Sequence, residues 1–282
     1  MSDLAILETS IVESMDPAFV KKTLSELPFY QIQGMLNVRA IPLPPTSAKR
    51  GLILRSAETN HITSLGKTQI SQELGVTKIF DLRGDKERAR FGPDPLDIPD
   101  VEIVCVPAMS ASSQTDDLKA TFTKFAARGD ECFVDFYREV LDNGVSAYKT
   151  IFEFLRDEVA DGKGCLIHCS GGKDRTGVAA MLILDLIGVP DEEIVKDYAL
   201  TRVGVEPVRE MMMTTRFAPL LLEPEVREAT VSGMSCKPSA MRATLKMLRE
   251  EYGGAAGYLK DRLGFSAEGV AKIIENLSSK EA

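Results

Sequence analysis

The sequence has no apolar run long enough to cross a membrane as a helix. The longest candidate, Val178–Val189, is interrupted by Asp185 and falls short of the ~18 consecutive apolar residues that a span requires. The first residues also differ from a secretory leader, since Asp3, Glu8 and Glu13 are acidic where a leader is basic and then apolar. We therefore expect no stable membrane insertion and no N-terminal targeting segment.

Cysteine and histidine are scarce. The chain has two histidines and five cysteines, and no two cysteines stand in a C-x-x-C spacing. An odd number of scattered cysteines argues against a disulfide framework and against a zinc site. We expect a reducing compartment, the cytoplasm, and no metal or other cofactor.

Positive charge is in deficit. Lys and Arg number 34 against 42 Asp and Glu, which gives a formal net charge of −8 at pH 7. This balance opposes unspecific binding to nucleic acid or to an anionic membrane. We expect no nucleic-acid partner, and any phosphate-bearing ligand must be attracted by a local field.

The composition is that of a folded globular chain. Hydrophobic residues make up 44% and charged residues 27% of the 282 residues, close to globular averages. No repeat of fixed period and no long linker divides the chain, so we expect one domain over residues 1–282 with a core of about 37–263. The sequence leaves the oligomeric state open.

Short runs rich in β-branched residues predict buried strands at Leu52–Leu54, Val76–Asp81, Val101–Val106 and Cys165–His168. Helical patterns alternate with them, notably Ser64–Leu74 and a longer stretch from Leu118 to Glu158. After residue 190 the strand signal fades. This order predicts an α/β fold: a central, mostly parallel sheet flanked by helices, with a helical insertion and a helical C-terminal third.

The stretch His168–Gly177, HCSGGKDRTG, carries the candidate chemistry. A predicted strand ends at His168 and an apolar helix follows from near Arg175, so the turn between them directs backbone N–H groups and the positive helix end into one hollow. Gly171 and Gly172 let the backbone curl there. These residue types in this order predict an anion site.

Cys169 and Arg175 share this predicted hollow. The planar guanidinium suits two phosphate oxygens, and a cysteine beside it at a helix N-terminus is expected to be a thiolate nucleophile at neutral pH. The hydroxyl of Thr176 is placed to donate to the sulfur and to ease its later departure. A nucleotide-binding P-loop is excluded, because an aspartate follows the Gly-Lys pair where Ser or Thr is required.

The stretch resembles the signature loop of the cysteine-dependent phosphatase superfamily, His-Cys-x5-Arg followed by Ser or Thr. Its Gly-Lys-Asp-Arg-Thr is similar to the microbial tyrosine/serine protein phosphatase family. Other segments agree over roughly Asn37 to Leu263: Leu54-Arg55-Ser56-Ala57, Leu74-Gly75-Val76, Asp81-Leu82-Arg83 with Glu87, Asp197-Tyr198-Ala199-Leu200-Thr201 and Gly257-Tyr258-Leu259. The resemblance implies a fold like that of protein-tyrosine and dual-specificity phosphatases.

One segment departs from the family pattern. Asn37-Val38-Arg39 leads here to Ala40-Ile41-Pro42, where the family usually has Asn-Phe-Arg-Asp followed by a small hydrophobic residue and Gly. The edge of the site is therefore expected to differ from that of its relatives.

The resemblance implies a metal-independent mechanism. A cysteine thiolate attacks a phosphomonoester, and water then hydrolyses the phosphocysteine intermediate. Carried onto this sequence, Cys169 is the nucleophile, Arg175 binds and stabilises the phosphoryl oxygens, and the phosphate-binding backbone donors are Ser170, Gly171, Gly172, Lys173 and Asp174.

Further residues are expected to support the loop. His168 would orient it, and Thr176 would assist the leaving thiolate. Asp81 and Arg83 lie at a strand end, where their charges either brace Lys173 and the aspartate beside it or form a surface ion pair.

The general acid has several candidates. We prefer Asp174, because it lies within the loop and reaches the leaving oxygen without closure of a lid. Its cationic neighbours favour the ionised form, so this role requires an acidic optimum or a bound phosphate dianion. The alternatives are Asp116 or Asp117, separated from the loop by a helical insertion, and Asp81, which a neighbouring arginine would hold.

The polar segment Ser110–Thr115 is expected to be mobile and to form a lid over the loop, packed by Phe122, Phe125, Phe133 and Phe136. The alternative is that these aromatic residues fill the core of an ordinary helical insertion.

Two substrate classes remain open. One is phosphotyrosine and phosphoserine or phosphothreonine in proteins; the other is phosphoinositides, because Lys173 resembles a lysine that lipid phosphatases of the superfamily carry in this loop. The acidic charge and the lack of a basic amphipathic anchor favour proteins. A non-enzymatic phosphate-binding pseudo-phosphatase would normally have lost Cys169, and a sulfurtransferase would lack the Arg-Thr pair.

Overall fold

The computed structural model describes residues 3–45, 47, 49, 51–91, 97–109, 118–126 and 129–278. In this part of the chain the strands form one sheet: β1 Arg39–Ala40, β2 Ile53–Ser56, β3 Val76–Asp81, β4 Glu102–Cys105 and β5 Gly164–His168. Their order in space is β1-β2-β5-β3-β4, parallel throughout except for β1, which is antiparallel to β2. The strand that leads into the candidate loop, β5, is therefore the central one.

The helices before β5 are α1 Asp3–Leu7, α2 Pro17–Leu24, α3 Ser64–Thr68, α4 Asp85–Phe91, α5 Leu118–Thr123, α6 Glu131–Asn143 and α7 Val145–Asp157. Those after it are α8 Asp174–Leu186, α9 Asp191–Ala199, α10 Thr201–Gly204, α11 Arg209–Met211, α12 Ala218–Leu222, α13 Pro224–Met234, α14 Pro238–Tyr252, α15 Gly254–Asp261 and α16 Ala267–Ser278. Short 3-10 turns lie at Val159–Asp161 and Glu206–Val208, and π-helical turns at Gln69–Glu73 and Met212–Arg216.

The predicted α/β fold with a helical C-terminal third is confirmed. The strand Val76–Asp81 has the predicted bounds, whereas the run predicted at Leu52–Leu54 begins one residue later and extends to Ser56. The long helical stretch is divided into α5, α6 and α7, because glycines interrupt it at residues 129 and 144. The two-residue strand β1 was not predicted, since it is too short to show an alternating pattern.

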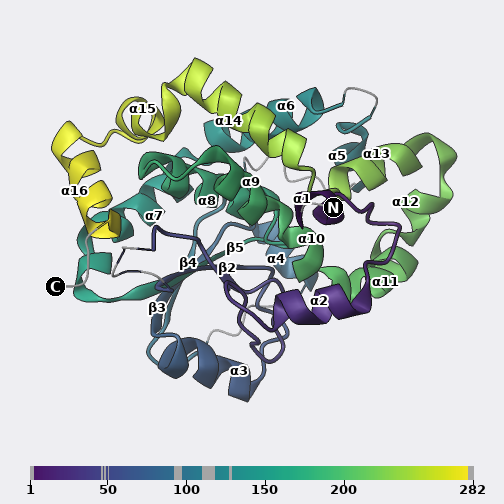
Figure 1. Cartoon of the computed structure of the whole chain (residues 1–282), viewed down its shortest axis with the longest axis horizontal. Coiled ribbons are helices and arrows are strands. Elements are labelled where there is room, and N and C mark those ends of the chain that lie inside the picture. The colour runs from purple at the N-terminus through teal and green to yellow at the C-terminus, as the bar shows by residue number, and fades with distance from the viewer. Residues whose placement is uncertain are drawn as a thin grey trace.

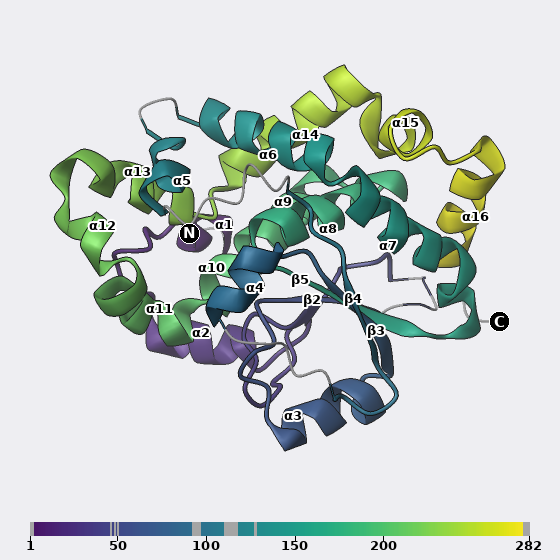
Figure 2. The same ribbon diagram turned by 180° about the vertical axis from the view of Figure 1, so that it is seen from behind.

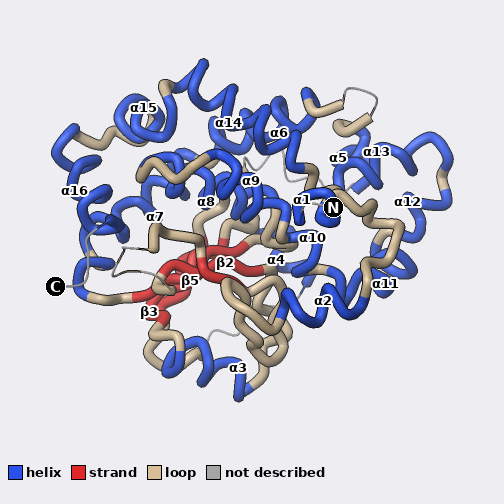
Figure 3. The backbone as a smooth tube through the Cα atoms, in the orientation of Figure 1, coloured by secondary structure: helices blue, strands red, loops and turns tan. Residues whose placement is uncertain are grey.

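The two faces of the sheet are buried in different clusters. Alternate residues of each strand point to opposite faces. Ile53, Phe80 and Ile167 belong to the large core formed with α6–α9 and α14–α16, whereas Leu54, Ile79 and Leu166 belong to a smaller one on the other face. Figure 3 shows the sheet at the centre, α3 on one side and the long helices on the other.

Helix α8 lies within the large core. All of its residues are buried except Asp174 and Asp185, as the apolar pattern predicts. The chain then continues through helices that extend over this side of the sheet, coloured from green to yellow in Figure 1. No helix of the described residues is both long and apolar enough to cross a membrane.

Candidate active site

The candidate loop joins the central strand to the buried helix. β5 ends at His168, and α8 begins at Asp174, so residues 169–173 form the connection. Cys169 lies at the base of this loop with only 2% of its surface exposed. Cys169 opens the connection that leads to the N-terminus of α8, where backbone N–H groups have no helical partners.

Three successive carbonyls of the loop are bound from outside. The oxygens of Ser170–Gly172 accept hydrogen bonds, in order, from the Glu58 backbone N–H at 3.0 Å, from Asn37 Nδ2 at 3.1 Å and from Arg55 Nη2 at 2.6 Å. In a trans peptide the carbonyl and the following N–H point in opposite directions. The three N–H groups that follow these carbonyls therefore point to the inner side of the loop, as an anion site requires.

Gly172 is required by the fold of the loop. Its φ is +65°, and a Cβ atom there would lie 2.2 Å from the backbone oxygen of Ser56. Only glycine satisfies both constraints. Gly171 differs, because a Cβ on it would meet nothing within 4 Å.

Arg175 is held at the rim of the loop by Glu87 of α4. Its Nη1 and Nη2 donate to the two carboxylate oxygens at 2.7 and 2.8 Å, and the hydroxyl of Ser170 donates to the same carboxylate. Burial alone would raise the pKa of Glu87, but the charge and hydrogen bonds of Arg175 outweigh it and lower the pKa to about 2. Figure 2 shows α4 beside the ends of β2 and β5.

Lys173 points away from the inner side of the loop. Its ammonium donates to the backbone oxygens of Gly233 and Ser235 at 2.9 and 3.1 Å and lies 5.3 Å from the centre of the Phe133 ring. The side chain is buried, which alone would lower its pKa, but the nearby Asp174 carboxylate raises that pKa above the ordinary value. Lys173 therefore ties the loop to the end of α13.

Asp174 is exposed enough to reach a ligand. Its Oδ1 pairs with Lys173 Nζ at 2.9 Å and accepts from the Tyr137 hydroxyl at 2.9 Å, while 28% of its side chain is exposed. The Tyr137 hydroxyl also bonds to that of Tyr198, at 2.7 Å. Both partners bind one carboxylate oxygen, Oδ1, and among the described residues Oδ2 has no hydrogen-bond partner.

The predicted supporting residues lie beside the loop. His168 is fully buried, with Nδ1 3.3 Å from the Cys169 oxygen and Nε2 3.9 Å from Asp81 Oδ1. Arg83 binds both oxygens of Asp81 and donates to Asn60. The pair formed by Asp81 and Arg83 is buried, so the alternative of a surface ion pair is wrong.

One predicted contact is not formed. The Thr176 hydroxyl is buried and has no hydrogen-bond partner among the described residues, so it does not donate to the sulfur in this structure. The lid predicted at Ser110–Thr115 and the alternative acids Asp116 and Asp117 lie outside the described residues.

Three of the four phenylalanines of the predicted lid lie in the core, and the fourth, Phe122, is partly buried against it. Phe125, Phe133 and Phe136 are buried and pack against one another, and Phe122 packs edge-on against Phe217. This arrangement matches the alternative in which they fill a helical insertion.

Three residues that hold the loop, Asn37, Arg55 and Glu87, have no predicted role of their own. In the sequence they appear only within segments that resemble the phosphatase family. A charged residue inside a buried strand, such as Arg55 in β2, was the available signal, because a buried charge requires a specific partner.

Curated relatives are phosphatases. The chain is 28% identical over 261 residues to the triple specificity protein phosphatase PtpB of Mycobacterium tuberculosis, covering 82% of this chain and 92% of the relative. It is 29% identical over 230 residues to a tyrosine-protein phosphatase of Nostoc commune, covering 81% and 74%.

A solved structure with partial similarity is the core catalytic domain of the PP-IP phosphatase SIW14 from S. cerevisiae. It is 14% identical, with a TM-score of 0.34, and the match covers 68% of this chain and 94% of that domain. The model of the tyrosine phosphatase family matches residues 30–279. The family predicted from the sequence is thus confirmed, and the chain belongs to the tyrosine phosphatase family.

Proposed function

We propose that the protein hydrolyses phosphotyrosine and phosphoserine or phosphothreonine in proteins, through a phosphocysteine intermediate on Cys169. The observation that carries this proposal is the direction of the loop. Its carbonyls at Ser170–Gly172 are bound outward, which leaves the N–H groups that follow them to bind the phosphoryl oxygens together with the guanidinium of Arg175.

In the first step the thiolate of Cys169 attacks phosphorus. An S–P bond forms while the bond from phosphorus to the leaving oxygen breaks, and that oxygen takes a proton from the general acid. The inward N–H groups and Arg175 stabilise the negative charge on the phosphoryl oxygens as it spreads in the transition state. These groups are fixed before substrate arrives, so little reorganisation is needed.

In the second step water attacks the phosphocysteine. A new P–O bond forms, the S–P bond breaks, and the thiolate of Cys169 leaves as inorganic phosphate is released. One proton is lost by the attacking water, and the group that served as general acid is the base that accepts it. Every group in both steps is a side chain or backbone group of the protein.

Asp174 is our choice for the general acid. Its position at the first residue of α8 places the carboxyl at the rim of the loop, and Oδ1 is fixed by Tyr137 while Oδ2 remains for the leaving oxygen. Asp81 is fully buried and bound by Arg83, which suits a brace rather than an acid.

The position of Lys173 favours phosphoproteins over phosphoinositides. A lysine that meets additional ring phosphates must reach into the substrate site, whereas this ammonium is bound to Gly233 and Ser235. The relatives named as a tyrosine-protein phosphatase and as a triple specificity protein phosphatase support activity on phosphoproteins. A thiolate nucleophile also requires a reducing compartment, so we propose the cytoplasm.

The substrate proposal is tested with phosphotyrosine, phosphoserine and phosphothreonine peptides and a short-chain phosphoinositide, measuring released phosphate. We expect turnover of peptides, unchanged by a metal chelator, and no turnover by Cys169→Ser. If the phosphoinositide is the faster substrate by an order of magnitude, the phosphoprotein proposal is wrong. If chelator abolishes turnover and a divalent ion restores it, the cysteine mechanism is wrong.

The acid is tested with a series of aryl phosphates of increasing leaving-group basicity. We expect Asp174→Asn to be near normal on very acidic phenols and progressively slower on basic ones, because only a basic leaving oxygen needs the proton. A flat dependence in Asp174→Asn, with a steep one in Asp117→Asn, would move the acid to the segment between β4 and α5.

A further inference from the structure

A buried cluster of three charges lies directly behind the phosphate loop. Asp197 of α9 accepts from Arg39 Nε at 3.0 Å and also binds Arg55 Nη1. Both guanidiniums are fully buried, and the carboxylate side chain is 2% exposed. The residues come from β1, β2 and α9, so the cluster joins two strands to a helix that lies far along the chain.

Each arginine is connected by hydrogen bonds to one carbonyl of the loop, Arg55 directly and Arg39 through Asn37. Arg55 uses Nη2 to bind the Gly172 oxygen while its Nη1 is held by Asp197. Arg39 uses Nη1 to bind the side-chain oxygen of Asn37, whose Nδ2 donates to the Gly171 oxygen. Asp197 is therefore the common partner of the two arginines from which these hydrogen-bond chains start.

Stabilisation of the fold alone does not explain this cluster. Two positive charges share one negative charge in a buried site, and burial together with the neighbouring Arg55 lowers the pKa of Arg39 to about 10. A pKa lowered in this way means that folding is opposed by the charge of Arg39 at neutral pH. Buried ion clusters of this kind often contribute less stability than apolar residues of the same volume. What the cluster does supply is a fixed position for two hydrogen-bond donors.

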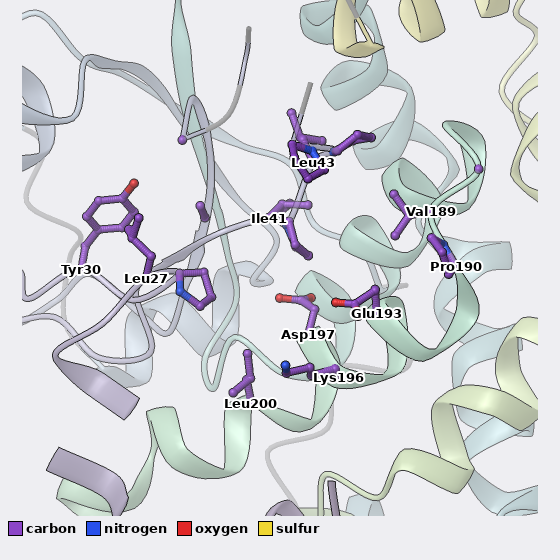
Figure 4. A pocket seen from close by; sticks show the side chains of 17 residues that line it. Leu27, Tyr30, Ile41, Leu43, Val189, Pro190, Glu193, Lys196, Asp197 and Leu200 are labelled. Atoms are coloured by element: carbon purple, nitrogen blue, oxygen red, sulfur yellow. The ribbon is translucent and has the colours of Figure 1, made fainter. Parts of the chain in front are cut away.

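The far side of Asp197 borders a cavity and not the phosphate site. A cavity of about 880 Å³ is lined by residues that include Ile41, Val189, Glu193, Lys196 and Asp197, and by none of residues 168–176. Figure 4 shows Asp197 on the same helix as Glu193 and Lys196 at one side of this cavity. Among the described residues, the side-chain partners of the Asp197 carboxylate that lead to the loop are Arg39 and Arg55.

We propose that Asp197 is a positioning residue for the phosphate loop, which acts through Arg39 and Arg55 to keep the carbonyls of Gly171 and Gly172 outward and the N–H groups inward. The proposal rests on the proposed function, in that these N–H groups bind the phosphoryl oxygens. It concerns oxyanion binding itself, so it is tested without turnover.

Electrostatics alone predicts the opposite result. Removing a negative charge near an anion site strengthens anion binding by Coulomb attraction. If Asp197 acts by position, its removal frees the arginines from their common partner, the loop carbonyls lose their donors, and anion binding weakens. The sign of the change in affinity therefore separates the two effects.

The experiment measures calorimetrically the affinity of inorganic phosphate and of vanadate for Cys169→Ser, with and without Asp197→Asn. We expect a loss of about 10- to 100-fold, the range found for the outer partners of metal-binding side chains. In the enzyme with its cysteine, Asp197→Asn is expected to raise KM and lower kcat together for an aryl phosphate. Unchanged or tighter anion binding would overturn the proposal.

Two control variants address charge and folding. Glu193→Gln removes a carboxylate one turn before Asp197 on α9, in the same cavity wall. Among the described residues, Glu193 contacts neither Arg39 nor Arg55. Asp185→Asn removes a mostly buried carboxylate that also binds an arginine, Arg249, at the other end of α8. We expect both to keep wild-type anion affinity. A comparable loss in either one would make the effect of Asp197 unspecific.

If Asp197→Asn does not fold, the proposal can be tested with a second variant, Arg55→Lys. Arg55→Lys keeps the positive charge beside Asp197, but a single ammonium does not replace the two ends of the guanidinium that hold the carboxylate and the Gly172 oxygen. We expect it to weaken phosphate binding and to shift the backbone amide NMR signals of Gly172 and Lys173. Arg55→Lys with unshifted signals and wild-type affinity would overturn the proposal.

The two proposals fail in different ways. If Cys169→Ser with no other change binds neither phosphate nor vanadate, the proposed function is wrong and no role remains for Asp197 in it. If Cys169→Ser binds the anions and adding Asp197→Asn leaves the affinity unchanged, only the positioning role is wrong.

Discussion

The phosphate loop has an arginine–carboxylate cluster on each side, and the two clusters differ in exposure. In front, Glu87 binds both Nη atoms of Arg175, and 23% of its side chain is exposed. Behind, Asp197 binds Arg39 and Arg55 with almost no exposure. In the proposed function the same chemistry has two uses. The front cluster holds Arg175, which we propose binds substrate, whereas the rear cluster is proposed to position the loop backbone.

Breaking the rear cluster is expected to have the largest effect on stability. Asp197→Asn leaves two buried guanidiniums without their common counter-charge, which lowers the free energy of unfolding by about 3–5 kcal/mol. Chemical denaturation with wild type and Glu87→Gln side by side measures it. If Asp197→Asn lost less free energy of unfolding than Glu87→Gln, the front cluster and not the rear one would contribute more to stability.

Breaking the front cluster is expected to have an effect that depends on pH. The pKa of Glu87 is about 2 in the folded protein against an ordinary value of 4.5, so its stabilisation is complete above pH 4.5 and disappears as the pH falls through 2. We expect Glu87→Gln to lower the free energy of unfolding by about 3 kcal/mol at pH 7 and progressively less below pH 4.5.

The control for this variant is Glu251→Gln, which removes an equally bidentate but exposed partner of Arg138. Exposed pairs contribute at most about 1 kcal/mol. A penalty for Glu87→Gln that persisted undiminished at pH 2 would show that Glu87 acts by packing and not by charge.

The two glycines of the loop, Gly171 and Gly172, differ in how tightly the rear of the site packs against them. Gly172 faces the rear, where its left-handed φ and the nearby Ser56 oxygen exclude a side chain, whereas Gly171 has open space around its Cβ position. We expect Gly172→Ala to lower the free energy of unfolding by about 1–2 kcal/mol from the backbone alone, and the clash adds to this. In thermal denaturation the free energy of unfolding of Gly171→Ala should lie within a few tenths of a kcal/mol of the wild-type value. Equal losses of stability in the two variants would mean that the contact of Gly172 with Ser56 is not tight.

The smallest effect is expected where the front of the site meets its helical surroundings. Tyr137→Phe removes the hydroxyl that joins Asp174 to Tyr198, for a loss of about 0.5–1.5 kcal/mol. Tyr252→Phe removes an exposed hydroxyl that bonds to Asp142 and serves as the control in the same denaturation series. If the two variants lose equally, the buried position of the Tyr137 hydroxyl gives it no special role.

The part of the site that could be predicted from sequence is the part formed by neighbours in the chain. Strand, glycine turn and apolar helix follow one another in residues 164–186, so local pattern and spacing were enough to predict the loop and to single out Cys169 and Arg175. The parallel strands β2–β5 were predicted for the same reason, because each contains a short run rich in β-branched or apolar residues, whereas the two-residue β1 was missed.

The supporting groups could not be predicted because their partners are distant in sequence. Arg55 binds a carbonyl 117 residues later, and Arg39 binds a carboxylate 158 residues later. An arginine inside a buried strand signals that some partner must exist, but nothing local identifies that partner. Lys173 shows the same difficulty, since its predicted role in substrate binding depended on a direction that Gly233 and Ser235 determine.

These distant partners have a consequence for the order in which the site is completed as the chain is made. When Lys173 has been synthesised, Asn37 and Arg55 are already available, but Gly233 is added only 60 residues later. A nascent chain that stops before α13 therefore contains the cysteine and the arginine without the anchor of the lysine between them. Contacts that span so much sequence form late in folding, so phosphate binding should appear only once α13 has been added to the chain.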